Sequence, residues 1–354
     1  MKLPKALTFL SVALTLGLGV QIVTSTAIFL SAKPVRAYDS TLLAQVNQKN
    51  GAFYNSRGLA RLESGDMKGA IEDFNQALRI NPNDVEAYSN RGSAHLLLKE
   101  IKEAIEDFNQ ALRINPNYAK AHYNLGFAHF LSGDMKGAIK NFSQALRINP
   151  NYAQAYNSRG TVHFLSGDMK GAIEDFNQLL RINPKNAEAY NNRAFAHWRL
   201  GDMKGAIEDF NQALRINPNY DKAYNNRGFV RFLLGDMKEA IKDFNQALRI
   251  NPKDAEAYNN RGIARFQLGE KKEAIEDFNQ ALRINPNYAQ AYKNRGFTHL
   301  LLGDMKEAIE DFNQALRINP KDAEAYKNRA FARFRLGDKQ GAEADWKKAS
   351  DMLQ

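Results

Sequence analysis

Apolar and polar positions recur along most of the chain with a period of 34 residues. Each of the first eight copies carries an Asn-Pro pair near its end, and a fixed period of this length is typical of stacked helical repeats. Counted back from the first such proline, the repeats begin at residue 51, and the ninth runs to residue 354. The eight prolines of the pattern are Pro82, Pro116, Pro150, Pro184, Pro218, Pro252, Pro286 and Pro320.

Each repeat predicts two helices joined by a tight turn, as residues 221–254 illustrate. Helically spaced apolar and small residues run to Leu234, and Gly235 is expected to end the first helix because glycine readily adopts positive φ. Asp236 is expected to cap the second helix, with Glu239 completing a capping box. The second helix carries one apolar stripe, formed by Ala240, Ile241, Phe244, Ala247 and Leu248. We therefore expect an all-helical chain of helix–turn–helix repeats.

This pattern of bulky, small and aromatic positions resembles the tetratricopeptide repeat (TPR) family, in the form with Asn-Arg-Gly on the first helix. In the second repeat the family's key positions hold Tyr88, Gly92, Ala104, Phe108, Ala111 and Pro116. Departures are few: Ala194 and Ala330 replace the first-helix glycine, His122 replaces the tyrosine, Leu179 replaces an alanine, and Trp346 replaces the phenylalanine. The resemblance implies an all-α, right-handed α-solenoid of nine 34-residue helix–turn–helix repeats, with the first helices lining its concave face.

One departure from the family is systematic. The family often has leucine directly before the first-helix glycine, whereas eight repeats of this chain have arginine there. The same eight repeats carry aspartate on the second helix, whereas the third repeat has Leu125 and Asn141 instead. This joint absence predicts an Arg–Asp pair inside each repeat, since a buried arginine is usually paired. The alternative is an arginine row that binds anionic ligands. The arginines are Arg57, Arg91, Arg159, Arg193, Arg227, Arg261, Arg295 and Arg329, and the aspartates are Asp73, Asp107, Asp175, Asp209, Asp243, Asp277, Asp311 and Asp345.

Histidine also recurs at one position of the repeat, where other repeats have arginine. A zinc ion needs several nitrogens at ~2.1 Å, whereas equivalent atoms on neighbouring helices are expected ~8–10 Å apart. We therefore expect a cationic or amphipathic packing role at this position, with no metal site and no cofactor. The histidines are His95, His129, His163, His197 and His299.

Composition mainly excludes other classes of function. The chain has no cysteine, which excludes a disulfide scaffold, a thiolate metal site and a cysteine nucleophile. It has no glycine-rich phosphate loop, HExxH motif or nucleophile elbow, so we expect no enzyme. The formal net charge is +10, but residues of both signs are interspersed in every repeat. Because nucleic-acid binding usually needs a segregated basic face, we expect no nucleic acid among the partners.

The first helices vary more between repeats than the second helices, so they are the better candidates for a binding surface. On the geometry implied by the resemblance, the concave face carries aromatic residues in i, i+3 pairs with asparagines nearby, which suits a peptide or a partner helix. The alternative is that this stripe is mostly inter-repeat core, because stacked helices bury one face anyway. The predicted protein-binding residues are Phe127, Phe130, Asn157, Asn191, Phe195, Trp198, Asn225, Phe229, Phe232, Asn259, Phe266, Phe297, Phe331 and Phe334.

Families of this fold that bind a C-terminal carboxylate use a clamp of Lys, Asn and Arg on three successive first helices. Here Asn90, Asn192 or Asn260 could supply the middle asparagine. The partner positions lack the required Asn and Arg. The clamp is not present as such, and binding of a chaperone tail is disfavoured.

The N-terminal segment differs from the repeats. Two lysines precede 27 uncharged residues, 6–32, and Val35-x-Ala37 follows, which resembles a bacterial secretory signal cleaved before Tyr38. The uncharged stretch exceeds the usual h-region of ~7–15 residues and reaches the ~20 needed to cross a bilayer, so an uncleaved anchor is the alternative. The predicted organisation is a signal peptide or membrane anchor at 1–37, a linker or N-terminal cap at 38–50, and the repeats at 51–354.

We therefore expect a scaffold for protein–protein interaction that binds a peptide or partner helix on its concave face during complex assembly. We expect it to be exported to the periplasm, a lumen or the extracellular space, or anchored to a membrane through residues 6–32. The alternative is a structural array that associates with copies of itself and binds no peptide, and nucleic-acid binding is a third, less favoured alternative. The sequence identifies neither the partner nor the oligomeric state.

Overall fold

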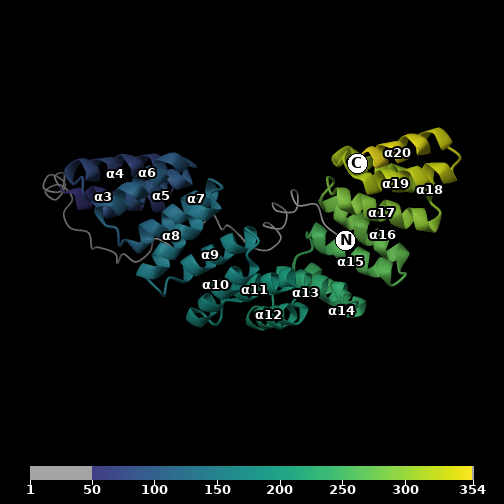
Figure 1. The fold of residues 1–354 in the computed structure, drawn as a ribbon, viewed down its shortest axis with the longest axis horizontal. Helices are drawn as coiled ribbons and strands as arrows, with labels where there is room; N and C mark the ends of the chain where they lie inside the picture. The colour runs from purple at the N-terminus through teal and green to yellow at the C-terminus, as the bar shows by residue number, and fades with distance from the viewer. Residues whose placement is uncertain (1–49, 353–354) are drawn as a thin grey trace. The chain divides into compact units, whose positions relative to one another are not determined.

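The computed structural model describes residues 50–352, and their regular structure is entirely helical. Eighteen helices follow one another in a repeated helix–turn–helix order, which confirms the all-helical prediction (Figure 1). The predicted signal peptide or anchor at 1–37 lies outside the described residues, as does the linker up to residue 49. Within the described range, no helix has the length and apolar character needed to cross a membrane.

The chain divides into two compact units between Gly201 and Asp202. The described part of the first unit contains α3 (Gly51–Glu63), α4 (Met67–Ile80), α5 (Val85–Leu97), α6 (Ile101–Ile114), α7 (Ala119–Leu131), α8 (Met135–Ile148), α9 (Ala153–Leu165), α10 (Met169–Ile182) and α11 (Ala187–Leu200). The second unit contains α12 (Met203–Ile216), α13 (Asp221–Leu233), α14 (Met237–Ile250), α15 (Ala255–Gln267), α16 (Lys271–Ile284), α17 (Ala289–Leu302), α18 (Met305–Ile318), α19 (Ala323–Arg335) and α20 (Lys339–Asp351). Odd-numbered helices are the first helices of their repeats, and even-numbered helices are the second.

The core of each repeat centres on one phenylalanine of the second helix. Phe244 is fully buried, and a Cβ on Gly228 would lie only 2.8 Å from its Cε1 atom, so glycine is needed where α13 approaches α14. Phe244 and Ala240 also pack with Ala264, which belongs to the next repeat. Each repeat therefore completes its core with its neighbour, as stacked repeats do. The equivalent phenylalanines, all at most 1% exposed, are Phe74, Phe108, Phe142, Phe176, Phe210, Phe244, Phe278 and Phe312.

The turn inside each repeat confirms one part of the sequence prediction and corrects another. Gly235 has a φ of 88°, the positive value expected for the residue that ends a first helix. The capping box is wrong, because the Asp236 side chain makes no capping hydrogen bond and Glu239 binds Lys242 instead, at 2.5 Å. Where glycine occupies the third helical position, the cap does form: Gly69 N–H donates to Asp66 Oδ1 at 2.9 Å. A Cβ on Gly69 would collide with that carboxylate, which explains why repeats with glutamate at this position lack the cap.

Candidate protein-binding face

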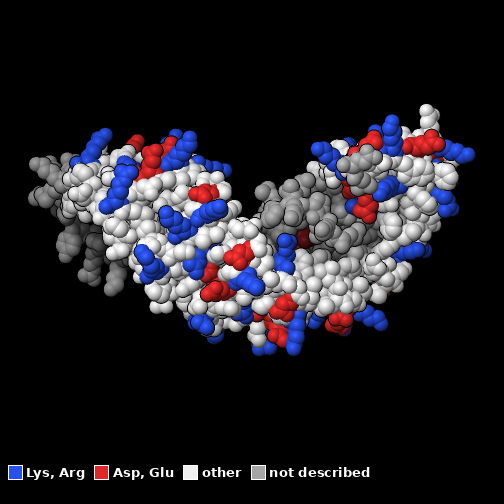
Figure 2. Space-filling model, viewed as in Figure 1, with Lys and Arg blue, Asp and Glu red and all other residues white. Residues whose placement is uncertain are grey.

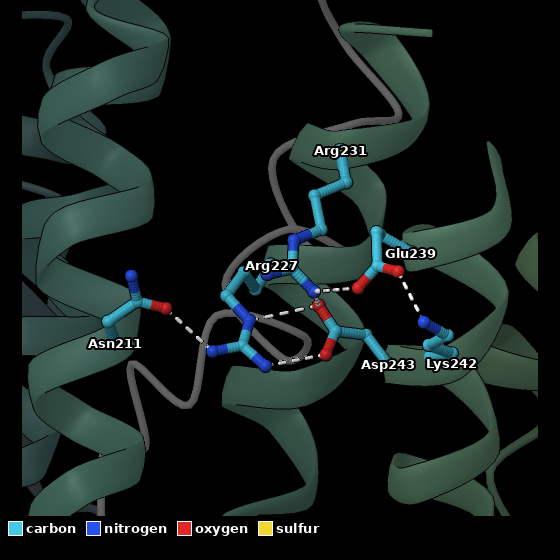
Figure 3. A network of polar contacts seen from close by, with 6 residues as sticks. All are labelled: Asn211, Arg227, Arg231, Glu239, Lys242 and Asp243. Carbon is cyan, nitrogen blue, oxygen red and sulfur yellow. Dashed lines mark hydrogen bonds and ion pairs between the residues drawn. The ribbon is translucent and has the colours of Figure 1, made fainter. Parts of the chain in front are cut away.

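The arginine before the first-helix glycine forms the predicted pair with the second-helix aspartate. Arg227 donates from Nε and Nη2 to Asp243 at 2.9 and 2.6 Å, and the Asp243 carboxylate is 3% exposed (Figure 3). Such a two-pronged, charge-assisted contact is among the stronger hydrogen-bonding arrangements in proteins. The pairs that lie within one compact unit are Arg57–Asp73, Arg91–Asp107, Arg159–Asp175, Arg227–Asp243, Arg261–Asp277, Arg295–Asp311 and Arg329–Asp345.

The sequence reasoning missed a second role of this arginine, which is to join neighbouring repeats. Arg227 Nη1 donates to Asn211 Oδ1 of the preceding second helix at 2.6 Å (Figure 3). The Arg227 guanidinium also lies over the Tyr224 ring, at 5.5 Å from its centroid. With these contacts the side chain is only 15% exposed, which argues against the alternative of an anion-binding arginine row. The sequence does contain an indication of this contact, because an asparagine recurs directly after the second-helix phenylalanine. The bridges are Arg91–Asn75, Arg159–Ser143, Arg193–Asn177, Arg227–Asn211, Arg261–Asn245, Arg295–Asn279 and Arg329–Asn313.

The third repeat, which lacks both members of the Arg–Asp pair, replaces them with a neutral arrangement. Leu125 is buried and packs with Phe108 of the preceding repeat. His122 lies with Nδ1 at 3.4 Å from Asn141 Oδ1, and Asn141 Nδ2 donates to the Gly137 carbonyl at 3.0 Å. Leu125, His122 and Asn141 therefore act together in place of the charged pair.

Two of the recurrent histidines, His95 and His163, lie between two acidic side chains of their own repeats, and His129 and His299 each lie beside one. His163 places Nδ1 at 2.8 Å from Asp168 and Nε2 at 4.0 Å from Asp175. Arg231 occupies the equivalent place in its repeat and donates to Asp243 at 2.8 Å. These contacts confirm a packing role that histidine and arginine share. Within residues 50–352, no cluster of three or more His, Asp or Glu side chains is arranged to hold a metal ion.

Three of the four predicted asparagines lie largely away from the surface. Asn191, Asn225 and Asn259 are 0%, 5% and 2% exposed. Asn225 accepts from Asn260 Nδ2 at 3.1 Å, which links neighbouring first helices, and Asn259 accepts in the same way from Asn294 at 2.8 Å. This corrects the predicted place of these three asparagines on the binding surface, because the close approach of the helices buries their amides. Only Asn157 stays half-buried.

The candidate asparagines of a carboxylate clamp are likewise used inside the fold. Asn90 Nδ2 donates to Asn55 Oδ1 at 3.0 Å, and Asn192 Oδ1 accepts from Asn191 at 3.2 Å. Asn260 is the donor to Asn225 already described. Their amides therefore bind other side chains of the chain.

The predicted aromatic pairs are close together, but several of them also belong to the core. The ring centroids of Phe127 and Phe130 are 6.3 Å apart, and those of Phe195 and Trp198 are 5.6 Å apart. Phe127 and Phe130 pack against the core around Phe142, and Phe232 packs against the core around Phe244. For Phe127, Phe130 and Phe232, the alternative interpretation therefore holds at least in part: these side chains contribute to the core between repeats. Phe195, Trp198, Phe229 and Phe266 are half-buried.

Exposed aromatic surface is concentrated in the last repeats of the second unit. Phe297, Phe331 and Phe334 are 37%, 42% and 48% exposed. The Phe266 and Phe297 rings, on α15 and α17, have centroids 5.8 Å apart, so the aromatic surface continues from one repeat to the next. Phe266, Phe297, Phe331 and Phe334 occupy two positions of the repeat, the ninth and the twelfth. We call the surface formed at these two positions of the first helices the first-helix face.

Ionisable groups at the N-terminal ends of the first helices have shifted pKa values. Burial, followed by the charges of Glu86 and Asp84, raises the pKa of Tyr118 to about 12. Burial and the nearby Asp254 charge raise the pKa of Glu256 from 4.5 to about 7. The side of the molecule in Figure 2 shows Lys and Arg mixed with Asp and Glu, with no segregated basic area in view.

Comparisons with known proteins agree with this architecture. One family model, described as "Tetratricopeptide repeat", matches residues 119–152, 187–220, 255–288 and 289–322, and a second, described as "TPR repeat", matches 58–99, 97–133, 160–201 and 230–269. Among solved structures, the APC/C hetero-tetramer Cut9–Hcn1 aligns with 82% of this chain and 57% of its own (20% identity, TM-score 0.55). A tetratricopeptide repeat protein from Parabacteroides merdae aligns with 70% of this chain and 98% of its own (21% identity, TM-score 0.54). At 20% and 21% identity, these two structures show a similarity of fold. A search of curated proteins finds no match.

Proposed function

Because this chain belongs to the tetratricopeptide repeat family, we propose that it is a scaffold for protein–protein interaction whose first-helix face binds a peptide or a partner helix. The observation that carries this proposal is the exposed aromatic surface on α15, α17 and α19, which continues between repeats through the Phe266–Phe297 contact. Aromatic side chains offer large contact areas at low entropic cost, and exposed groups of them mark interaction sites. The proposed face also includes partly buried residues, taken in each unit by itself: Phe127, Phe130, Asn157, Phe195 and Trp198 in the first unit, and Phe229 and Phe232 in the second.

Site-specific photocrosslinking tests this proposal. A photoreactive phenylalanine analogue replaces Phe266 or Phe297 on the first-helix face, and in matched controls replaces Gln246 or Gln280 on second helices. We expect the first-helix positions to give discrete adducts with partner proteins in a cell-envelope extract. Adducts of equal yield from both sets of positions, or from neither set, would contradict the proposal.

The alternative, a self-associating array, predicts a different result from the same variants. Light scattering of the purified chain would then show oligomers that grow with concentration, and the adducts would be dimers of the chain itself. The scaffold proposal expects adducts of other masses and no such growth.

We further propose that the protein acts during complex assembly outside the cytoplasm, exported or anchored through its N-terminal segment. The support is the sequence of residues 1–37, with its uncharged stretch at 6–32 and the small pair before Tyr38. Cell fractionation with N-terminal sequencing of the mature chain separates the two forms. A start at Tyr38 in a released fraction indicates cleavage, and a start at Met1 in the membrane fraction indicates an anchor. A chain that starts at Met1 and remains in the cytoplasm would contradict export.

The right-handed winding of the repeats stays a prediction.

A further inference from the structure

One face of α19 combines exposed aromatic rings with basic side chains. Lys327, Phe331, Phe334 and Arg335 occupy positions i, i+4, i+7 and i+8, so they share one side of the helix. Phe331 and Phe334 are 42% and 48% exposed, and Lys327 and Arg335 are exposed at either end of the pair. We call these four residues the α19 stripe.

The neighbouring first helix extends the apolar part of this surface. α17 packs beside α19, and its Phe297 and Leu301 are 37% and 46% exposed. Each of these residues corresponds by repeat position to a member of the α19 stripe, Phe297 to Phe331 and Leu301 to Arg335. The two helices therefore present one apolar area with cations at both ends of its α19 edge.

Other cations near this surface are compensated, whereas those of the stripe are not. Lys293 lies 3.2 Å from Asp322 and 2.9 Å from Glu324, and Arg333 donates to Asp345 at 2.9 Å. Lys327 and Arg335 form no ion pair with any residue of the described range; Arg335 instead lies over the Phe331 ring at 5.9 Å. The stripe thus has a positive charge at each end that nothing within residues 50–352 neutralises.

The rest of the second unit shows that this charge arrangement is local. The positions equivalent to Lys327 are Asn225 on α13 and Asn259 on α15, and those equivalent to Arg335 are Leu233 and Gln267. The aromatic positions continue through these helices, but the flanking cations do not. The two flanking cations therefore distinguish α19 from α13 and α15.

Resting on the proposed function, we propose that the α17–α19 surface binds an acidic segment of a partner protein that carries apolar side chains between its carboxylates. Eight residues of helix separate Lys327 from Arg335, which corresponds to ~12 Å along the axis. An extended segment rises ~3.3 Å per residue, so two carboxylates about four residues apart reach both cations. The residues between them place apolar side chains against Phe331, Phe334 and Leu301. Charge complementarity sets the preference for this partner, and apolar burial supplies most of the affinity.

An anionic membrane is the less favoured occupant of the same surface. Each Lys or Arg near an anionic membrane contributes roughly 1 kcal/mol, and recognition of such membranes relies on clusters of about four to eight cations. The stripe has two. A protein segment of matched spacing uses both cations and both rings at once.

Selection from a displayed library of random 16-residue peptides tests the proposal with the full chain as bait. Three variants are compared with the unaltered protein: Lys327→Glu/Arg335→Glu, Phe331→Ser/Phe334→Ser, and the control Lys272→Glu/Lys306→Glu, which changes two exposed lysines on second helices. The stripe residues are exposed, so both variants should fold, and circular dichroism checks this. Enriched peptides are then measured by fluorescence anisotropy at 50 and 300 mM salt.

We expect enrichment of peptides with Asp or Glu about four residues apart and Leu, Ile, Phe or Trp between them. Charge reversal should weaken their binding about tenfold or more at 50 mM salt, serine substitution should weaken it more, and the control should change it less than twofold. Enrichment of basic peptides, or no enrichment, would overturn the proposal. It would also be overturned if the chain bound phosphatidylglycerol vesicles in a co-sedimentation assay but bound no peptide. Peptides that bind the stripe variants as well as the unaltered chain would overturn it too, but would leave the wider first-helix face as the proposed site.

Discussion

At the scale of single residues, Lys99 stands out in the turn of the second repeat. It has a φ of 64°, the only positive value for a non-glycine residue among residues 50–352, at the position where other repeats have glycine. A side chain in this conformation costs about 1 kcal/mol or more. We expect Lys99→Gly to stabilise the protein by roughly 0.5–1 kcal/mol, after the greater chain entropy of glycine is subtracted. The midpoint of urea unfolding measures the change.

The matched control for Lys99 is Gly133→Ala in the next repeat. Gly133 has a φ of 84°, and a Cβ there would meet nothing within 4 Å, so only the backbone conformation is penalised. We expect this variant to be destabilised by a similar amount. Equal midpoints for the glycine and lysine forms at residue 99 would show that the turn carries no strain.

Glu256 leads to a prediction about pH at the same scale. Its pKa is raised from 4.5 to about 7, first by burial and second by Asp254, so the folded chain holds this proton more tightly than the unfolded chain. The stabilisation is therefore complete below pH 4.5 and is lost as pH rises through 7. Glu256→Gln should remove about 2 kcal/mol of this pH dependence between pH 5 and pH 8. Urea unfolding at both pH values, with Glu276→Gln as the exposed control, measures it. The same pH slope with and without Glu256 would contradict this account.

At the scale of the helical pair, the third repeat shows how the Arg–Asp contact can be replaced. Arg227→Leu alone leaves the buried Asp243 carboxylate with Arg231 as its remaining cation at 2.8 Å, so we expect a loss of about 2–4 kcal/mol. The double variant Arg227→Leu/Asp243→Asn reproduces the Leu125–Asn141 pair, and we expect it to lose only about 1 kcal/mol. Urea unfolding of the two variants decides between them. A double variant no more stable than the single would show that His122 is essential to the neutral arrangement.

The helical pair also shows what sequence reasoning could and could not predict. Gly235 and the Asn-Pro pairs marked the helix ends because glycine and proline act locally on the backbone. The Arg227–Asp243 pair was predictable because both residues disappear together in the third repeat. The bond from Arg227 to Asn211 was not, since it depends on how one repeat is rotated against the next. Phe232 packs with a core that includes Ala264 of the following repeat, whereas Phe334 lies on the first helix of the last described repeat and stays exposed.

At the scale of the whole molecule, the helices within each compact unit pack against helices of the same or an adjacent repeat. Each helix packs against the helices next to it in sequence, and each first helix also touches the first helices of the adjacent repeats. Within a unit, the buried phenylalanine of a second helix packs with its own repeat and the following one, as Phe108 does with Ala104 and Leu125 and Phe312 does with Ala308 and Ala332. Stability in such an array is roughly a sum of repeat and interface contributions. The effect of a lost core contact should therefore stay close to its origin.

Two phenylalanines at equivalent core positions provide the test of this locality. Phe108, on α6, and Phe312, on α18, are both 0% exposed, and Phe→Ala in such a core typically costs about 3–5 kcal/mol. We expect Phe108→Ala to speed amide hydrogen exchange in α5–α8 and to leave α13–α20 unchanged, while Phe312→Ala does the reverse, in α17–α20 against α3–α10. Each variant is the control for the other, since both remove the same side chain from the same environment. Faster exchange across all helices in either variant would mean that the repeats unfold as one cooperative body, because a cavity in one repeat would then lower the stability of every other.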